Sequence, residues 1–256
     1  MLLEFLLIFI LGLCIGSFLG VIVDRSVSGE SLIFGKSHCE NCKKDIAWYD
    51  LIPIVSFIAL RAKCRNCKKP ISFYYPVIEL STGILFVLAF IFATGANAGI
   101  VYLAYLLIVV SSLISIFFTD LKYGIIPDKI IFPTILISAI YLILNPSSVI
   151  LNHFLSSLGA FLFFLILLIV TAGKGMGWGD VKYAILMGLI LGFPNIVVGL
   201  YLAFLTGAMV GVILILWRKK KLRGSTIPFG PFLVAGTVLS LFYSDFFLSM
   251  LRLKVF

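Results

Sequence analysis

The sequence predicts an all-α membrane protein that crosses the bilayer about eight times and carries a cytoplasmic four-cysteine lobe between its first two transmembrane helices. The first indication is composition. Of 256 residues, 62% are hydrophobic and only 12% are charged, and the mean hydropathy is +1.19. A soluble domain would be about half apolar and about a quarter charged. The second is a series of apolar runs, several near the length of about 20 residues that a crossing helix needs. The third is one polar segment, 24–70, which holds four of the five cysteines.

The first apolar run covers roughly residues 2–23 and ends at Asp24 and Arg25. It has no basic segment before it and no small-residue cleavage site, which favours a retained transmembrane helix over a signal peptide. Seven further helices are expected, one for each later apolar run. They lie near residues 76–94, 100–119, 129–144, 150–171, 181–193, 195–217 and 227–250. The run at 181–193 is short for a crossing.

Basic residues indicate which helix ends face the cytoplasm. Segment 24–70 holds nine Lys and Arg against five Asp and Glu, and RKKKLR at 218–223 adds five more basic residues. Under the positive-inside rule both segments are cytoplasmic. Counting crossings from the first loop then puts the uncharged connections 95–99 and 145–149 outside. Cytoplasmic loops thus explain the net charge of +9, and no nucleic-acid partner is expected.

Two aspartates stand at the cytoplasmic ends of predicted helices. Asp120 ends the third helix, and Asp180 begins the sixth within the sequence GMGWGDVK. The topology therefore brings two carboxylates from distant segments to the same membrane depth on the same side. A charged group at that depth costs several kcal/mol unless it is paired or reaches water, and such residues are usually functional. We interpret the two aspartates as a pair.

Such a pair has a specific chemistry. Neighbouring carboxylates share one proton, so one can act as a general base toward water while the other protonates or hydrogen-bonds the carbonyl under attack. The predicted reaction is amide hydrolysis without a metal or a covalent intermediate. Gly177 and Gly179 would let backbone approach closely and leave the helix entrance irregular. The alternative is that each aspartate only caps a helix, a role that suits Asp128 after Pro127.

The cytoplasmic lobe contains two C-x2-C pairs, separated by 21 residues: Cys39 with Cys42, and Cys64 with Cys67. Four thiolates in this spacing match a structural zinc site, and they leave no open position for catalysis. Surrounding basic residues would lower the thiol pKa values. A disulfide would need an oxidising compartment, which the topology excludes. His38 is an alternative ligand beside the first pair.

Between the two cysteine pairs lies an apolar stretch, IAWYDLIPIVSFIAL, at residues 46–60. It is too short to cross a bilayer and is interrupted by Asp50 and Pro53. We expect it to lie along the membrane interface, with Trp48 and Tyr49 at the level of the lipid headgroups.

With these motifs in place, the sequence closely resembles the type IV prepilin leader peptidases, which also process pseudopilins of competence and type II secretion systems. The resemblance extends over nearly the whole chain, in blocks that occur in the family's order. These blocks are GSFLG (16–20), SHCENC (37–42), AWYDLIPIVSF (47–57), CRNCKKPIS (64–72), YPVIELSTG (75–83), FTDLKYGIIPD (118–128), GMGWGDVK (175–182) and IPFGPFL (227–233). One departure is Gly20, where the family usually has Asn.

The resemblance implies an aspartic endopeptidase of the plasma membrane, with Asp120 and Asp180 as catalytic residues and Pro228 and Gly230 in a supporting motif. Such enzymes cleave a short basic leader after a glycine at the cytoplasmic face. Members with four cysteines commonly also methylate the new N-terminus, using S-adenosylmethionine. The implied partners are prepilins or pseudopilins, together with membrane lipid. The implied division is a first helix (1–23), a methyltransferase-associated zinc lobe (24–70) and a peptidase domain (71–256).

The roles of Glu79 and Pro228 and the overall function each have an alternative interpretation. Glu79 would provide negative potential for binding a basic leader, or is simply a carboxylate at the interfacial start of the second helix. Pro228, in IPFGPF, would free backbone groups to pair with an extended peptide, or only kinks the chain. The competing functions are a proton-coupled transporter, whose aspartates would relay protons, and a non-enzymatic assembly factor of a pilus or competence machine.

Overall fold

The computed structural model describes residues 2–32, 35, 37–39, 41–96, 99–145, 150–173, 175–217 and 228–250. Within these residues the regular structure is helical, apart from two isolated β-bridges in the cysteine lobe. The predicted all-α class is therefore confirmed. The basic segment 218–223, which supported the predicted orientation, lies outside the described residues.

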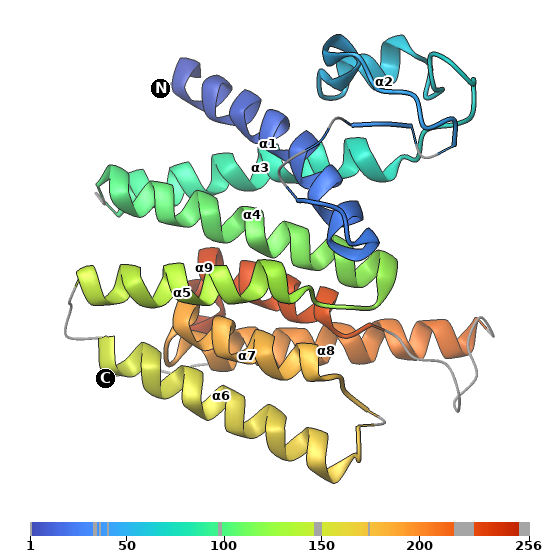
Figure 1. Ribbon diagram of the computed structural model, residues 1–256. Helices are drawn as coiled ribbons and strands as arrows, with labels where there is room; N and C mark the ends of the chain where they lie inside the picture. The colour runs from blue at the N-terminus through green and yellow to red at the C-terminus, as the bar shows by residue number, and fades with distance from the viewer. Residues whose placement is uncertain are drawn as a thin grey trace. The chain divides into compact units, whose positions relative to one another are not determined.

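A long helix occurs at each of the predicted apolar runs (Figure 1). In chain order these are α1 (Leu2–Ser28), α3 (Tyr74–Gly95), α4 (Ile100–Tyr123), α5 (Asp128–Leu144), α6 (Ile150–Val170), α7 (Trp178–Leu191), α8 (Asn195–Leu216) and α9 (Gly230–Met250). Between α1 and α3 the lobe adds a short 3-10 helix, η1 (Trp48–Leu51), and a five-residue helix, α2 (Val55–Ala59).

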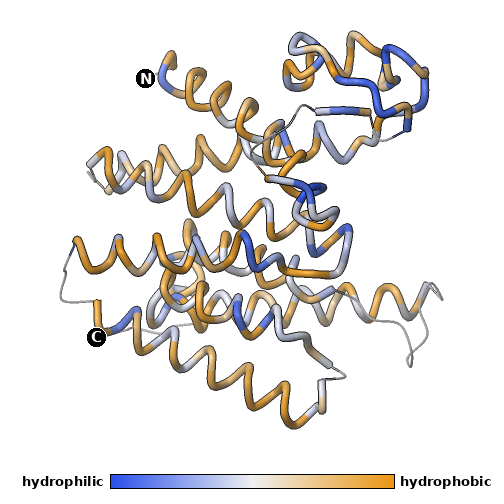
Figure 2. Tube along the Cα trace, viewed as in Figure 1, coloured by the Kyte–Doolittle hydropathy of each residue, from blue (hydrophilic) through white to orange (hydrophobic). Residues whose placement is uncertain are grey.

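Six of these helices are long and apolar enough to cross a membrane, and Figure 2 shows how hydrophobic they are along their lengths. The chain is thus a multi-pass membrane protein. The prediction of about eight crossings is not matched in number, because α5 has 17 residues and α7 only 14. At 1.5 Å per residue α7 is about 21 Å long, whereas the hydrocarbon core is about 30 Å thick.

The chain forms two compact units, Met1–Ser115 and Ile116–Phe256, and the boundary falls within α4. The first unit contains α1, the cysteine lobe, α3 and residues 100–115 of α4. The second contains the end of α4 and all later helices, and therefore both aspartates. The predicted division at residues 23/24 and 70/71 concerns function and stays a prediction.

In the first unit α1 and α3 pack in antiparallel directions with almost no space between their backbones. A Cβ atom on Gly12 would lie 2.7 Å from the Cα atom of Gly83, and one on Gly16 would lie 2.7 Å from the Cα atom of Glu79. Small residues permit such close contact between membrane helices. Nearer the lobe, the hydroxyl of Tyr75 donates a hydrogen bond to Asp24 at 2.9 Å. These contacts set the register of the two helices.

In the second unit α7 is surrounded by other helices, which explains how so short a helix is accommodated. Most of its residues are buried, and it contacts α5, α6, α8 and α9. A Cβ atom on Gly188 would overlap the backbone of Ser157 in α6. On another side, the buried hydroxyl of Tyr183 donates a hydrogen bond to Thr237 of α9 at 2.8 Å. The N-terminal end of α7, which carries Asp180, is therefore held in place by packing.

Candidate active site and candidate metal centre

The structure places Asp120 and Asp180 in the same unit and near each other. Asp120 lies in the last turn of α4, and Asp180 is the third residue of α7. Their residues are only 6% and 8% exposed, and the charge of Asp120 acts on Asp180. Two segments that are 60 residues apart in the sequence thus contribute one carboxylate each to a common, partly buried place.

Asp180 is fixed by the irregular entrance of α7. The helix is capped by Gly177, whose backbone N–H donates to Oδ2 of Asp180 at 3.0 Å, while the backbone N–H of Asp180 donates back to the Gly177 carbonyl at 3.2 Å. Asp180 therefore does take part in capping α7, as the alternative interpretation of the sequence suggested. Within the described chain this is the only hydrogen bond to the carboxylate, which leaves its second oxygen without a protein partner.

Asp120 is held against the first residue of α9. Its carboxylate lies against the backbone N–H of Gly230, which favours the charged form. The contact is so close that a Cβ atom on Gly230 would lie 2.5 Å from Oδ2 and 2.9 Å from Cγ of Asp120. The positive end of the α9 macrodipole therefore faces this carboxylate. From the sequence, Gly230 was selected only because it belongs to a motif. The structure explains why this position has no side chain: a Cβ atom would collide with the carboxylate of Asp120.

Two further contacts lie beside the site, and sequence reasoning missed both. A Cβ atom on Gly179 would lie 3.1 Å from Cβ of Ile126, so the loop after α4 packs on the entrance of α7. Beside it, Lys182 of α7 forms a salt bridge of 2.6 Å with Asp128, the first residue of α5. Asp128 thus has the helix N-terminal position expected for it and a cation of its own. No sequence signal marked Ile126.

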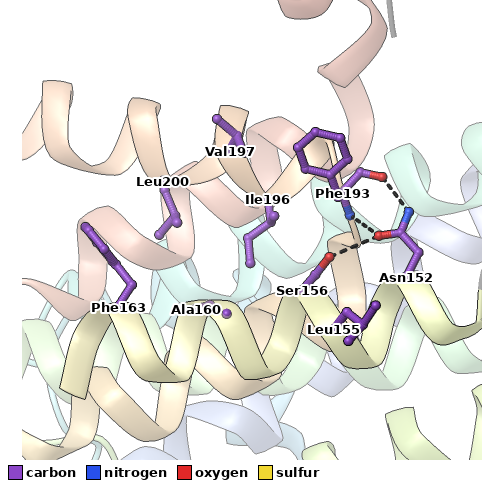
Figure 3. Close-up of a pocket in the computed structure, with 10 residues that line it drawn as sticks. Asn152, Leu155, Ser156, Ala160, Phe163, Phe193, Ile196, Val197 and Leu200 are labelled. Atoms are coloured by element: carbon purple, nitrogen blue, oxygen red, sulfur yellow. Dashed lines mark hydrogen bonds between the residues drawn. The ribbon is translucent and has the colours of Figure 1, made fainter. Parts of the chain in front are cut away.

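A groove between α6 and α8 differs from the aspartate site in position and in chemistry. It is lined mainly by apolar side chains, among them Phe163, Ile196 and Leu200 (Figure 3). At its rim the amide of Asn152 donates to the Phe193 carbonyl at 2.7 Å and accepts from the Phe193 N–H at 2.9 Å. None of its lining residues is titratable. Its rim at Phe193 follows the C-terminal end of α7 by two residues, whereas Asp180 lies at the N-terminal end.

The four predicted cysteine ligands come together in the first unit. The sulfur atoms of Cys39, Cys42, Cys64 and Cys67 all lie within 4.8 Å of one another, and those of Cys39 and Cys67 are 3.8 Å apart. All four thiols are free. Sulfurs placed tetrahedrally at about 2.3 Å from zinc are about 3.8 Å from each other, so the cluster has the size of a metal site. His38 is not part of the cluster.

The two cysteine pairs are presented by equivalent turns. The N–H of Cys39 donates to Lys44 and that of Cys64 donates to Lys69, at 3.0 and 2.8 Å. In the second turn the backbone N–H of Lys69 also lies near the sulfur of Cys67 and lowers the pKa of that thiol to about 6. Basic residues were expected to favour the thiolate, and at this cysteine the backbone has that effect.

The lobe is also held together by an ion pair. The guanidinium of Arg65 donates two hydrogen bonds to the carboxylate of Asp50, at 2.8 and 2.7 Å. These bonds lower the pKa of Asp50. Because Arg65 follows Cys64 directly, the pair joins the second cysteine turn to the apolar stretch between the turns.

Glu79 lies in α3 and faces the same apolar stretch. Its residue is 7% exposed, and Oε2 accepts a hydrogen bond of 2.8 Å from the backbone N–H of Ile54. The hydroxyl of Ser17 in α1 is within hydrogen-bonding reach of both this carboxylate and the carbonyl of Leu51. Glu79 therefore has protein partners in its own unit. Its suggested role in substrate binding stays a prediction.

Comparison with known proteins yields two family models and a set of relatives. The model "Bacterial Peptidase A24 N-terminal domain" matches residues 10–93, and the model "Type IV leader peptidase family" matches residues 107–212. A Bacillus subtilis protein named "Prepilin leader peptidase/N-methyltransferase" is 31% identical over 95% of this chain and 96% of its own length. A protein of the same name from Pseudomonas aeruginosa is 28% identical over 92% of this chain and 89% of its own length. No solved structure matches the chain.

Proposed function

This chain belongs to the type IV leader peptidase family and is a peptidase, and from this premise we propose that Asp120 and Asp180 are its catalytic pair. The observation that carries the proposal is their meeting in one buried place, each beside the backbone N–H of a glycine. The family supports type IV prepilin processing as the biological task. The specific substrates are prepilins or pseudopilins with a short basic leader, cut after a glycine.

The pair acts on the scissile peptide through water. Two neighbouring carboxylates hold one proton between them. The ionised carboxylate takes a proton from a water molecule, whose oxygen attacks the carbonyl carbon, and the protonated one donates to the carbonyl oxygen. The C–N bond then breaks, and the leaving amine takes up a proton. The hydrogen bond from Gly177 and the close contact with Gly230 keep the two carboxylates in position for these transfers.

The second activity that we propose is N-methylation of the new amino terminus, with S-adenosylmethionine as methyl donor. Its support is the name of the relatives, which includes N-methyltransferase, and the resemblance of the cysteine lobe. In this transfer the uncharged amine attacks the methyl carbon of the sulfonium, the C–S bond breaks, and the nitrogen releases a proton. We assign the lobe, residues 24–70, to this activity and residues 71–256 to peptide cleavage.

We further propose that zinc occupies the cysteine cluster in a structural role. The fit rests on four free thiols at the mutual distances of a tetrahedral site and on the preference of zinc for closed sites of thiolates. Cys39 and Cys42 would hold it from one turn, and Cys64 and Cys67 from the other. Bound there, zinc would join the two turns without taking part in either reaction.

The aspartate pair is proposed to face the cytoplasm. The support is the excess of Lys and Arg in segment 24–70, which begins near the C-terminal end of α1. Under the positive-inside rule this segment stays in the cytoplasm. Leader cleavage at that face would leave the apolar helix of the substrate in the membrane.

The experiment that tests both activities combines the purified enzyme, a synthetic prepilin and S-adenosylmethionine. Mass spectrometry of the products reports the position of the cut and the addition of a methyl group. Cleavage that occurs equally without S-adenosylmethionine would show that the two steps are separable. An uncut peptide under conditions where the enzyme is folded and zinc-loaded would contradict the proposed function.

A mutation at the first residue of α9 tests the geometry of the pair. In Gly230→Ala the new methyl group would be 2.5 Å from Oδ2 of Asp120, so the carboxylate must shift. A displacement of this size is expected to lower the cleavage rate by about 10- to 100-fold without loss of the folded protein. The matched control is Gly211→Ala in α8, where a Cβ atom meets nothing within 4 Å. Equal rates in the two variants would contradict the role of this contact.

A further inference from the structure

The apolar stretch of the cysteine lobe carries a row of exposed side chains that its own fold leaves uncovered. We call residues 48–59, which comprise η1, α2 and their connection, the strap. Trp48 is 78% exposed, Val55 is 61% and Ile58 is 68%. The exposed residues follow helical spacing, since Leu51 comes three positions after Trp48 and Ile58 comes three after Val55. A contiguous apolar surface of this kind marks contact with a membrane or a partner.

The strap is attached to two membrane helices, α1 and α3. On one side the hydroxyl of Ser17 donates to the carbonyl of Leu51 at 3.4 Å. On the other, the backbone N–H of Ile54 donates to Glu79 at 2.8 Å. The position of the strap along these helices is therefore determined by residues 17 and 79.

These two attachment points lie within the apolar part of both helices. The polar end of the helix pair is marked by Asp24 of α1, which accepts a hydrogen bond from Tyr75 of α3. Ser17 precedes Asp24 by seven residues, and Glu79 follows Tyr75 by four. At 1.5 Å per residue the attachment points are about 10 and about 6 Å farther along the helices than this polar pair. Since the hydrocarbon core is about 30 Å thick, the centre of the strap lies at its depth, not on its surface.

The backbone of the strap is equipped for such a depth. Irregular backbone is tolerated inside a membrane only when its polar groups have partners. Ile54 is the N-cap of α2, so its N–H has no acceptor within that helix, and Glu79 accepts it. Pro53 has no N–H to satisfy. The N–H groups of Ser56 and Ile58 donate to Ile52 and Ile54, at 3.1 and 3.0 Å.

We propose that the strap is inserted into the lipid bilayer beside α1 and α3, with Val55 and Ile58 in contact with acyl chains. Glu79 is the positioning residue that holds it there. This assignment accounts for a carboxylate inside a membrane helix that has no part in the aspartate pair. It also places the strap deeper than the interfacial position expected from its sequence.

The test places a single fluorescent reporter in the full-length, zinc-loaded protein. The chain has three tryptophans, and replacing all of them by Phe gives a background into which Ile58→Trp is introduced. The protein is reconstituted in phosphatidylcholine and phosphatidylglycerol vesicles whose acyl chains carry bromine. Val77→Trp on α3, where Val77 is 50% exposed, is the membrane control, and Lys44→Trp in the first cysteine turn is the aqueous control.

We expect the Ile58→Trp reporter to show blue-shifted emission and to be quenched as strongly as the Val77→Trp reporter. Quenching no stronger than that of the Lys44→Trp reporter would overturn the proposal. This outcome does not depend on the peptidase proposal, because the reporter measures lipid contact without any substrate.

Two replacements of Glu79 then test the positioning role. Glu79→Gln keeps an oxygen that accepts the Ile54 N–H, whereas Glu79→Leu removes it. Quenching at position 58 should persist in the Gln variant and be lost in the Leu variant. If both variants instead keep the quenching and lose cleavage or methylation equally, Glu79 acts on the substrate through its charge and the positioning role is wrong.

Discussion

Leader cleavage is expected to fall by at least about 1,000-fold when either Asp120 or Asp180 is replaced by Asn, since each change removes one partner of the acid–base pair. Asparagine has nearly the same shape, and its side-chain oxygen can still accept the N–H of Gly230 or Gly177. The loss would therefore reflect the missing proton transfer. The measurement is the rate of prepilin cleavage by the purified variants, with methylation of a pre-cleaved substrate as evidence that the protein is folded.

A nearby carboxylate provides the matched control for this prediction. Asp128 also lies at a helix end in the second unit, but it pairs with Lys182, and both side chains are partly exposed. Exposed ion pairs contribute at most about 1 kcal/mol, so Asp128→Asn should cleave at a rate close to that of the unchanged enzyme. Cleavage that survives Asp120→Asn or Asp180→Asn would remove the mechanism.

The second large effect concerns the metal. In a protein with Cys39 and Cys42 replaced by Ser, bound zinc should fall from one per chain to none, because two thiolates do not form a closed tetrahedral site. Zinc binding to such sites is worth about 10–16 kcal/mol in small peptides at neutral pH. The turns of the lobe should therefore lose their order, which limited proteolysis of segment 24–70 would detect. We expect methylation to be impaired more than cleavage.

Cys14 supplies the control for the zinc experiment. It lies in α1, is exposed and belongs to no cluster, so Cys14→Ser should retain both the metal and the resistance to protease. Metal content is measured after mild purification of each variant. One zinc per chain in the Cys39 and Cys42 double variant would refute the four-cysteine site.

The positions of the membrane helices were predictable because each depends on a local property. A run of about 20 apolar residues needs no partner to be recognised, and α1, α3 and α4 begin within a few residues of the expected positions. The number of crossings was not predictable in this way. The apolar run at 181–193 reads as a short crossing, yet its helix α7 is enclosed by neighbours, which only the packing reveals.

The candidate sites were predictable to different degrees. The cysteine cluster follows from spacing, since two C-x2-C pairs form a site wherever their turns meet. The meeting of Asp120 and Asp180 was predicted from the expected number of crossings between them, which puts both on one side. The groups that contact the two aspartates cannot be predicted from residue spacing or from the number of crossings. The backbone N–H of Gly230 and the packing of Ile126 on Gly179 depend on how helices lie beside one another.

The sequence by itself determined the fold class, the positions of the helices, the four cysteines as one set and the two aspartates as a pair. The length of an apolar run, the spacing of residues and the distribution of charge can be read from the sequence without the three-dimensional structure. The tertiary structure alone decided that Gly230 touches Asp120, that α7 is enclosed within its unit, and that Glu79 accepts the N–H of Ile54. These contacts depend on which helices lie side by side and in which register. Glycines allow the backbones to touch, and many different helix arrangements are compatible with the same hydropathy pattern.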